Sequence, residues 1–585
     1  MRFRTALFVG FVAAVAVASV GTVASGAATV DAPSDQTSEP VADEHLPDPE
    51  TDRLGWENGV WYNESIDVTP EDGLNETELD AVVARGMARV EYVRGLEFEE
   101  TPPVAVISRD EFREEAGSLY GNVTASQRIA ENVYYEALLM VDESTDAVGV
   151  QESNTAGGVG GYYDPANGEI KIVSENTTTP QMDEITLSQE LFHALQDQKF
   201  NISSYPSETT ENVNARNGII EGDGNYVDYL YQQSCENEWE GECIMPEESS
   251  VPSDFDPHLG LYQIQLQPYS DGPAFVSDLH EQEGWEAVNE VYENPPASTE
   301  QMIHPDKYGE DTPTTVTVED TSGEDWRPLD VENGTDYESF GEAGLYVTLW
   351  YPGYEILSEG GDEDDIIIPY RNHLNPAAGG LDEQDPYNYD YRYTAGWDGD
   401  RLVPYVTDES FETNETGYVY ELVWDSENDA AEFLEGYQQL LDYRGAQPVP
   451  DNESTYRIPD DARFGDAFYV QQDGTTVTIV NAPTVEDLSA IRAGAAPPNE
   501  TTPGETTTEG TTPGETMTEK TTEETMTDEA TGATTTDEMT DGETTGASGT
   551  TETTTETSDG FGPGFGVLAA VFAAVSTALV ASRRL

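Results

Sequence analysis

Apolar side chains recur every three or four positions between residues 186 and 198, and this spacing predicts one continuous helix. Leu187, Leu191 and Leu195 share a face of that helix, and neither Pro nor Gly interrupts it. Directly upstream, two β-rich runs flank an Asp-Pro-Ala-Asn-Gly turn sequence, which predicts a β-hairpin over 160–173. A hairpin followed by this helix is the centre of the predicted fold.

The same patterns predict elements on both sides of this centre, and together they indicate the α+β class. Upstream and downstream we expect helices at 78–95, 109–116, 217–229, 275–279 and 285–292, and a strand at 104–107. Prolines make 295–307 a rigid loop in which Thr299 is expected to cap a short helix before His304. A second α+β unit is expected to hold helices at 341–347 and 426–441 and strands at 395–405, 418–424, 467–470 and 475–480.

The N-terminus predicts a secretory signal peptide over residues 1–28. Arg2 and Arg4 precede an apolar run at 6–20, and small residues follow at 24–28. The alternative is a retained N-terminal span. The acidic, Pro-containing segment that follows predicts a disordered linker up to residue 77.

The C-terminal end predicts a stalk and a hydrophobic helix. Residues 494–558 are mostly Thr, Glu, Pro and Gly, which cannot bury a core. The apolar run from Phe565 to about Ser582 is barely long enough to span a bilayer, and the arginines after it place that end in the cytoplasm. The resulting domain plan is 1–28 signal peptide, 29–77 linker, 78–310 first domain, 311–493 second α+β domain, 494–558 stalk and 559–585 terminal signal.

Charge narrows the class of protein further. Lys and Arg number 24 and Asp and Glu 117, so the formal net charge is −93. Such a chain is not expected to bind nucleic acid, whose phosphates attract cationic surfaces. Acid spread along the whole chain indicates a protein adapted to high salt, where the Debye length is about 3 Å at 1 M. A disordered acidic chain is the alternative, and the Tyr, Trp and periodic apolar segments between 90 and 490 argue against it.

The predicted export of the chain affects how its cysteines and its Asn-x-Ser/Thr triplets are interpreted. Cys235 and Cys243 are the two cysteines, and outside the cell a local disulfide is favoured over two unrelated buried thiols. Asn-x-Ser/Thr triplets are candidate glycosylation sites on an exported chain. They occur at Asn63, Asn75, Asn122, Asn176, Asn201, Asn333, Asn414, Asn452 and Asn499.

The central helix carries the candidate chemistry. It contains Gln189-Glu190-Leu191-Phe192-His193, where a zinc metallopeptidase has His-Glu-x-x-His. Residues four apart share a helix face, so two imidazoles at this spacing reach one Zn²⁺ and the intervening Glu activates the metal-bound water. In this chain Glu190 and His193 are present and Gln189 takes the place of the first ligand. A neutral amide is a poor ligand for Zn²⁺.

The C-terminal sequence Pro563-Gly564-Phe565, followed by an apolar span and Arg-Arg, resembles the PGF-CTERM sorting signal of haloarchaeal surface proteins. The Thr-rich segment before it strengthens that resemblance. It implies processing by an archaeosortase, removal of the span, and a lipid-anchored protein at the membrane within the S-layer.

The body, from about 90 to 490, resembles haloarchaeal surface proteins related to gluzincin-like peptidases. The resemblance rests on five segments: Gly161-Tyr162-Tyr163-Asp164, Glu190 to Gln198, Glu221-Gly222-Asp223, Ser298 to Gln301 with His304 to Lys307, and Gly396-Trp397-Asp398-Gly399-Asp400. It implies a zincin-like first domain with ligands at position 189, His193 and Glu221, and Glu190 as general base.

His304 is a further candidate, either as a substitute ligand or as a hydrogen-bond donor; the alternative is that its loop merely packs against the site. With Gln189 in the first ligand position, we expect loose zinc binding and a surface binding or structural role. The alternative is a surface zinc peptidase that tolerates Gln189. The expected partners are the membrane, the processing enzyme, and an S-layer component or extracellular peptide.

Overall fold

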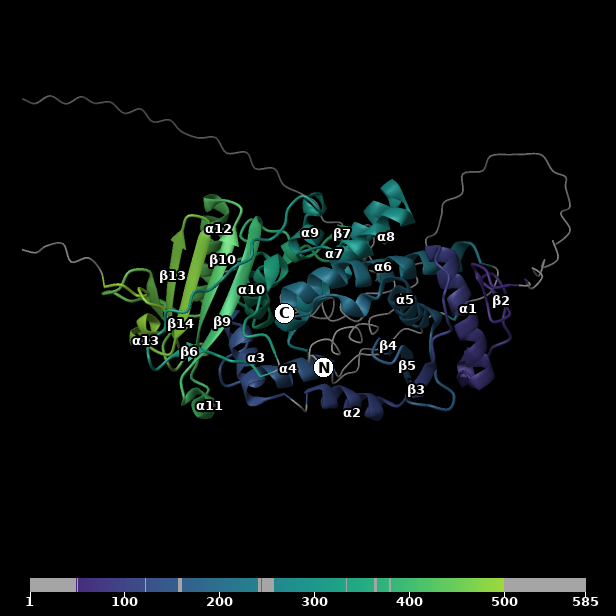
Figure 1. Ribbon diagram of the computed structural model, residues 1–585, viewed down its shortest axis with the longest axis horizontal. Helices are drawn as coiled ribbons and strands as arrows, with labels where there is room; N and C mark the ends of the chain where they lie inside the picture. Colours follow the sequence, from purple (N-terminus) through teal and green to yellow (C-terminus); the bar gives the residue numbers. More distant parts are fainter. Residues whose placement is uncertain are drawn as a thin grey trace, which may run out of the picture. The chain divides into compact units, whose positions relative to one another are not determined.

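The computed structural model describes residues 49, 51–120, 123–155, 160–239, 243–244, 257–332, 334–361, 366–377 and 380–498. This part of the chain is a mixed α+β protein, as the sequence predicted at that level (Figure 1). The signal peptide, the stalk and the C-terminal span with Pro563, Gly564 and Phe565 lie outside the described residues. Within them, every helix is too short or too polar to cross a bilayer.

The first part of the chain combines a small sheet with a group of packed helices. Its helices are α1 (Glu76–Arg94), α2 (Arg109–Tyr120), α3 (Ala125–Ala137), α4 (Ala147–Thr155), α5 (Glu184–Phe200), α6 (Thr210–Asn237), α7 (Leu259–Glu283), α8 (Trp285–Glu293) and α9 (Glu300–Ile303). Its strands β3 (Val104–Ile107), β4 (Gly161–Asp164) and β5 (Glu169–Val173) follow the order β3-β5-β4. β3 is parallel to β5, and β4 and β5 form the predicted hairpin.

The predicted central helix is α5, and it lies inside the helical group. Every residue from Glu184 to Gln196 is buried, because α1, α6 and β4 pack around it. Leu187, Leu191 and Leu195 join one apolar core with residues of α1 and α6. Polar side chains on this helix are therefore enclosed by protein, and each one needs a partner or a role.

The second part of the chain is an antiparallel sheet covered by helices. Its strands are β6 (Arg327–Pro328), β9 (Trp397–Val406), β10 (Gly417–Trp424), β11 (Gln447–Pro448), β12 (Thr455–Arg457), β13 (Ala467–Asp473) and β14 (Thr476–Ala482), in the order β11-β12-β13-β14-β10-β9-β6. Its helices are α10 (Gly341–Ser358), α11 (Ser410–Thr413), α12 (Glu427–Tyr443) and α13 (Val485–Ile491). Two short hairpins, β1–β2 (Trp56–Glu57, Val60–Trp61) and β7–β8 (Pro376–Ala377, Gly380–Leu381), lie outside both sheets.

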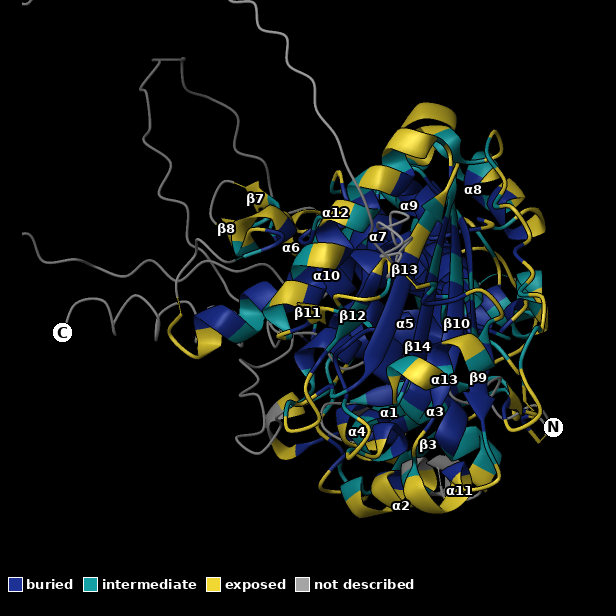
Figure 2. Ribbon diagram, turned by 90° about the vertical axis from the view of Figure 1, so that its left-hand side faces the viewer, coloured by how far each residue is buried: buried dark blue, intermediate teal, exposed yellow. Residues whose placement is uncertain are grey.

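Both faces of this sheet are covered, as the dark strands of Figure 2 show. Tyr420 and Leu422 enter the core shared with α10 and α12, whereas Val419 faces the opposite side, in a smaller core with α13. The period of two along β10 therefore places apolar side chains on both faces.

The largest core crosses the predicted domain boundary at residue 310. It joins Tyr134 of α3 and Ile264 of α7 to Trp350 of α10 and Tyr420 of β10. The two predicted domains thus share one hydrophobic core in the structure.

Two predictions about the start of elements are wrong. The predicted disordered linker already has structure from residue 51, since β1 and β2 pack beside α1 and a 3₁₀ turn follows at Pro70–Asp72. Tyr62 stacks on Tyr92 of α1 at 3.8 Å between ring centroids. Residues 217–229 do not begin a helix but lie in the middle of α6, which is capped by Thr209. The glycines at 218, 222 and 224 weaken the helical pattern in sequence, and packing against other helices overrides that preference.

A buried carboxyl pair joins β1 to α1 and makes stability depend on pH. Burial, together with the nearby Glu91, raises the pKa of Glu57 to about 8, and burial also raises the pKa of Glu91. Glu91 accepts hydrogen bonds from the backbone of Gly55 (2.8 Å) and Phe98 (2.7 Å), so Glu57 is the member that holds the proton.

We expect the free energy of unfolding to fall as pH rises from about 5 to above 8, because the raised pKa of Glu57 stabilises the fold only while Glu57 is protonated. Glu57→Gln supplies a permanent donor, and its unfolding curves should lose part of this pH dependence. Chemical denaturation in molar KCl at several pH values measures the effect, with exposed Asp80→Asn on α1 as control. An unchanged pH slope in Glu57→Gln would contradict the assignment.

Candidate functional site

The position of α5 is set by a buried charge cluster at its N-terminus. Glu184 accepts two hydrogen bonds from Arg85 (3.0 and 2.8 Å), one from Arg89 (3.0 Å) and one from the backbone of Ile244 (2.6 Å). Asp183 caps the helix by accepting from the backbone of Thr186 at 2.8 Å. Two arginines of α1 thus hold the first turn of α5 in the interior.

The cysteines belong to this anchor. Cys235 and Cys243 are bonded, with an S–S distance of 2.01 Å. The bridge holds the segment that carries Ile244 close to Glu184, and Arg89 Nη1 lies 3.1 Å from Cys243 Sγ. The loop closed by the bridge therefore supports the helix of the candidate site.

His193 is held in one orientation by a chain of hydrogen bonds. Its Nδ1 lies 2.7 Å from Oε1 of Gln196, whose Nε2 donates to the carbonyl of Ile220 and the hydroxyl of Tyr292. Gln196 Oε1 therefore accepts the hydrogen bond from Nδ1, so a neutral His193 carries its proton on Nδ1. The lone pair of Nε2 then points away from Gln196. A neighbour that fixes the imidazole in this way is typical of metal-binding histidines.

Nε2 of His193 faces Glu221, as the sequence predicted. Glu221 Oε2 lies 3.4 Å from it, and both side chains are buried. Two donor atoms that are each about 2.0–2.1 Å from a tetrahedral Zn²⁺ lie about 3.4 Å apart. The imidazole of α5 and the carboxylate of α6 thus have the separation of two ligands of one ion.

Carboxylate oxygens in this site lack hydrogen bonds. Glu190 Oε1 and Glu221 Oε2 are buried, and neither has a hydrogen-bond partner within the described part of the chain. Burial raises the pKa of Glu190 to about 8. Although burial alone lowers the pKa of His193, the carboxylates of Glu221 and Glu190 raise it to about 9.

Glycines on α6 bring these groups together. A Cβ at Gly222 would lie 2.6 Å from the backbone of Gly272 in α7, so the two helices cross at this point with no room for a side chain. A Cβ at Gly224 would lie 3.4 Å from Cε1 of His193. The Glu-Gly-Asp-Gly sequence is therefore a site of helix contact, which explains its place in the middle of α6.

The edge strand β4 lies beside Glu190. Val173 donates to the carbonyl of Gly160, so in the antiparallel register with β5 the backbone groups of Gly161 and Tyr163 point away from β5. A Cβ at Gly161 would lie 3.6 Å from Cγ of Glu190. A hydrogen bond from the backbone of Tyr163 lowers the pKa of Glu190, but burial raises that pKa by more. Among the described residues no strand pairs with this outer edge.

Gln189 lies one turn before His193 and is 7% exposed. Its amide makes no hydrogen bond to any described residue, so Oε1 is free to act as a ligand. The imidazole of His193 and the carboxylate of Glu221 have the separation of two ligands of a divalent cation, and the amide of Gln189, one turn earlier on α5, is the candidate for a third. An amide in place of the first imidazole makes the set a weak one for Zn²⁺.

His304 does not join this group in its described interactions. Its Nε2 lies 3.1 Å from Oε1 of Glu342 on α10. The prediction that Thr299 caps α9 is wrong: its side chain makes no capping bond, because its hydroxyl accepts from the backbone of Ala343 and its own N–H donates to Glu211 at 2.6 Å. The loop is tied to α10 and α6 instead.

Tyr269 and Arg216 were not predicted. The carboxylate of Glu221 and, above all, burial raise the pKa of Tyr269 far above its usual value, although the Tyr269 hydroxyl lacks a hydrogen bond of ordinary geometry. Arg216 is 2% exposed, and its Nε and Nη2 have no partner among the described residues. Neither residue has a local motif that marks it. Tyr269 comes near Glu221 only because α7 packs against α6, and Arg216 precedes Glu221 on α6 itself.

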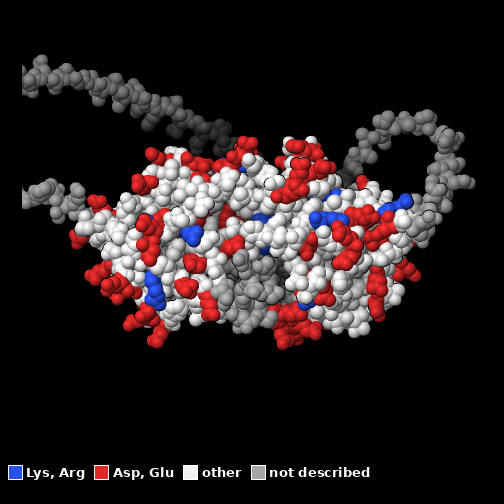
Figure 3. All heavy atoms as spheres, viewed as in Figure 1, with Lys and Arg blue, Asp and Glu red and all other residues white. Residues whose placement is uncertain are grey.

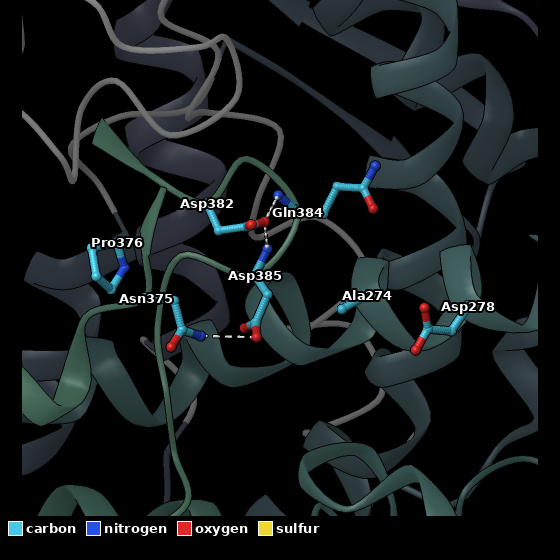
Figure 4. Close-up of a pocket in the computed structure, with 7 residues that line it drawn as sticks. All are labelled: Ala274, Asp278, Asn375, Pro376, Asp382, Gln384 and Asp385. Carbon is cyan, nitrogen blue, oxygen red and sulfur yellow. Dashed lines mark hydrogen bonds between the residues drawn. The ribbon is translucent and has the colours of Figure 1, made fainter. Parts of the chain in front are cut away.

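One surface pocket of about 340 Å³ lies between α7 and the segment 375–385 (Figure 4). Its acidic lining residues are Asp278, Asp382 and Asp385, and Asn375 donates to Asp385 at 2.8 Å. Glu190, His193, Glu221 and His304 do not line this pocket.

The candidate glycosylation sites differ in exposure. Asn63, Asn75, Asn176 and Asn201 are exposed. Asn414 and Asn452 are half-buried, and their Nδ2 groups donate to the carbonyls of Glu143 and Ala496. Asn122, Asn333 and Asn499 lie outside the described residues.

Residues 327–492 match a family described as "Domain of unknown function (DUF8575)". The match covers the seven-stranded sheet with α10 to α13, and it leaves out the helical part that holds Glu190, His193 and Glu221. Neither the curated proteins nor the solved structures contain a match to the chain.

Proposed function

We propose that this protein is an exported, membrane-anchored surface protein of a haloarchaeon whose helical part is a degenerate gluzincin-like site. In this proposal the site binds a divalent metal loosely and holds an extended peptide along β4. The observation that carries the proposal is the pair His193 Nε2–Glu221 Oε2 at 3.4 Å, with the buried Oε1 of Glu190 lacking a hydrogen-bond partner among the described residues.

The metal would be held by His193 and Glu221, with the amide of Gln189 as third ligand. Zinc bound there supplies a Lewis acid that polarises a carbonyl or acidifies water. Gln196 orients the imidazole of His193, and the Gly222–Gly272 crossing sets the approach of Glu221. Glu190 holds a proton at its carboxylate, since its pKa is about 8.

Peptide binding is supported by the outer edge of β4. An extended chain can hydrogen-bond to backbone groups that point away from the sheet, as in other cases of strand addition. Weak hydrolysis is the second candidate function. It requires Glu190 in its deprotonated form as general base, and the enclosed position of this carboxylate, whose Oε1 lacks a partner among the described residues, favours that role.

A zinc titration of the chelator-treated full chain in molar KCl tests the metal site. We expect one weakly bound equivalent, lost in His193→Ala and in Glu221→Gln, and retained in the control Asp110→Asn, whose side chain is 95% exposed. Equal binding by wild type and His193→Ala would reject the proposed site.

The same samples test the peptide edge by fluorescence anisotropy with a labelled unstructured peptide. Gly161→Pro removes an outward N–H while leaving the pairing with β5, so it should weaken binding. Gly161→Ala keeps the N–H and is the matched control. If both variants bind peptide as the wild type does, β4 is not the docking strand.

A further inference from the structure

Two clusters of possible metal ligands lie near α9 and α10, and a lysine pairs with the carboxylates of only one of them. Glu300, Asp311 and Asp425 form the first, with ligand atoms all within 4.8 Å of one another. Lys307 Nζ lies 2.5 Å from Glu300, 2.7 Å from Asp425 and 3.1 Å from Asp311. The ammonium group contacts all three carboxylates and takes the position that a metal ion would need, so we propose no metal there.

The second cluster consists of His304, Glu342 and Asp390, whose ligand atoms also lie within 4.8 Å of one another. No Lys or Arg of the described chain forms an ion pair with either carboxylate here. The Glu342 side chain is 0% exposed, and its Oε2 has no hydrogen-bond partner among the described residues. A fully buried carboxylate with a free oxygen is costly unless something binds it.

We propose that His304, Glu342 and Asp390 form a second divalent-cation site, separate from the one at His193.

The spacing supports this assignment. His304 Nε2 and Glu342 Oε1 are 3.1 Å apart, close to the roughly 3.4 Å between donor atoms on a tetrahedral Zn²⁺. Asp390 is exposed, so its carboxylate is free to close the remaining gap. One imidazole with two carboxylates suits Zn²⁺ and its neighbours Co²⁺ and Mn²⁺, whereas Ca²⁺ and Mg²⁺ take shells of oxygen ligands.

The site would join two parts of the chain. His304 follows α9, in the helical part, whereas Glu342 lies in the first turn of α10 and Asp390 in the loop before β9. An ion bound by all three would therefore link the region that matches DUF8575 to the helix group that carries His193.

Cobalt is the probe that separates the two sites, because its visible absorption reports its ligands. The full chain carrying His193→Ala, stripped with chelator in molar KCl, should still bind one equivalent of Co²⁺, and Zn²⁺ should displace it while millimolar Ca²⁺ should not. Adding Asp390→Asn at the exposed position should lower affinity by at least about tenfold. Asp311→Asn, in the cluster filled by Lys307, is the matched control and should leave affinity unchanged.

His304→Ala should abolish the Co²⁺ spectrum, and circular dichroism checks that each variant is folded. The proposal is overturned if the His193→Ala chain shows no saturable Co²⁺ site. It is equally overturned if Asp390→Asn and His304→Ala bind Co²⁺ as tightly as Asp311→Asn. Because His193 is absent from every sample, failure of the site at His193 does not affect the result.

Discussion

Replacing Gln189 by His should raise the zinc affinity of the chain by more than about 100-fold, since even second-shell changes at metal sites alter affinity by about 10–100-fold. The replacement adds an imidazole one helical turn before His193, on the same face of α5. The remaining groups already stand in place, because His193 Nε2 and Glu221 Oε2 lie 3.4 Å apart. The new side chain therefore completes a set of two imidazoles and one carboxylate.

The gain in affinity should come with hydrolysis if Glu190 has kept its role. Glu190 would again lie beside a metal-bound water, and its pKa of about 8 suits proton transfer near neutral pH. Peptide cleavage by Gln189→His, abolished in Gln189→His/Glu190→Gln with zinc binding retained, would show this. Calorimetric titration in molar KCl measures affinity, and a protease assay with an unstructured peptide measures turnover.

Lys199→His is the control, since it adds an imidazole to the same helix away from His193 and should not change zinc affinity. If Gln189→His gains nothing over Lys199→His, the assumed geometry is wrong and Glu221 loses its assignment as third ligand. If the wild type already binds zinc at full occupancy and cleaves peptide, the degenerate interpretation is wrong instead.

The sequence predicted much of the fold because local periodicity is strong where elements are long. The helices α1, α5 and α12 and the strands β9, β10 and β14 were expected within a few residues of their observed bounds. The pair His193 and Glu221 was predicted from spacing and resemblance, and the structure brings these residues together. These are features that single segments encode.

The remainder depends on contacts between distant segments. Glu184 is one of many acidic residues in the sequence, and only the fold shows that it binds Arg85 and Arg89. Gly222 weakens the helical pattern in the sequence. Its role, to let α6 and α7 cross closely at Gly272, is visible only in the fold. His304 was considered for the first site, and its partner Glu342 lies 38 positions downstream with no motif between them.

We expect the folded part of the chain, residues 51–498, to unfold at about 10 mM salt. The screening of repulsion between its acidic side chains, and not the size of its core, should decide whether it is folded. Two like charges 10 Å apart in water repel by roughly 0.4 kcal/mol. The Debye length is about 30 Å at 0.01 M salt and about 3 Å at 1 M, so salt removes nearly all of this repulsion. With a net charge of −93, many such pairs add up to more than the roughly 5–15 kcal/mol that stabilises a typical domain.

The location of the cations sharpens this expectation. Four arginines are at most 2% exposed, so their positive charges lie in the interior and not among the acidic side chains of the surface. They are Arg85, Arg89, Arg94 and Arg216. Figure 3 shows Asp and Glu in many separate patches across the visible face, with few Lys and Arg between them. The folded state concentrates these acids, and the unfolded chain separates them.

Circular dichroism and tryptophan fluorescence over a falling KCl series measure the transition. A variant with Glu281, Glu283 and Glu290 changed to Gln, all exposed, should remain folded at lower salt than the wild type. Sucrose is the control solute, since it favours compact states by exclusion without screening charge, and it should not replace KCl. An unchanged spectrum in dilute buffer, or full rescue by sucrose, would show that charge repulsion does not limit this fold.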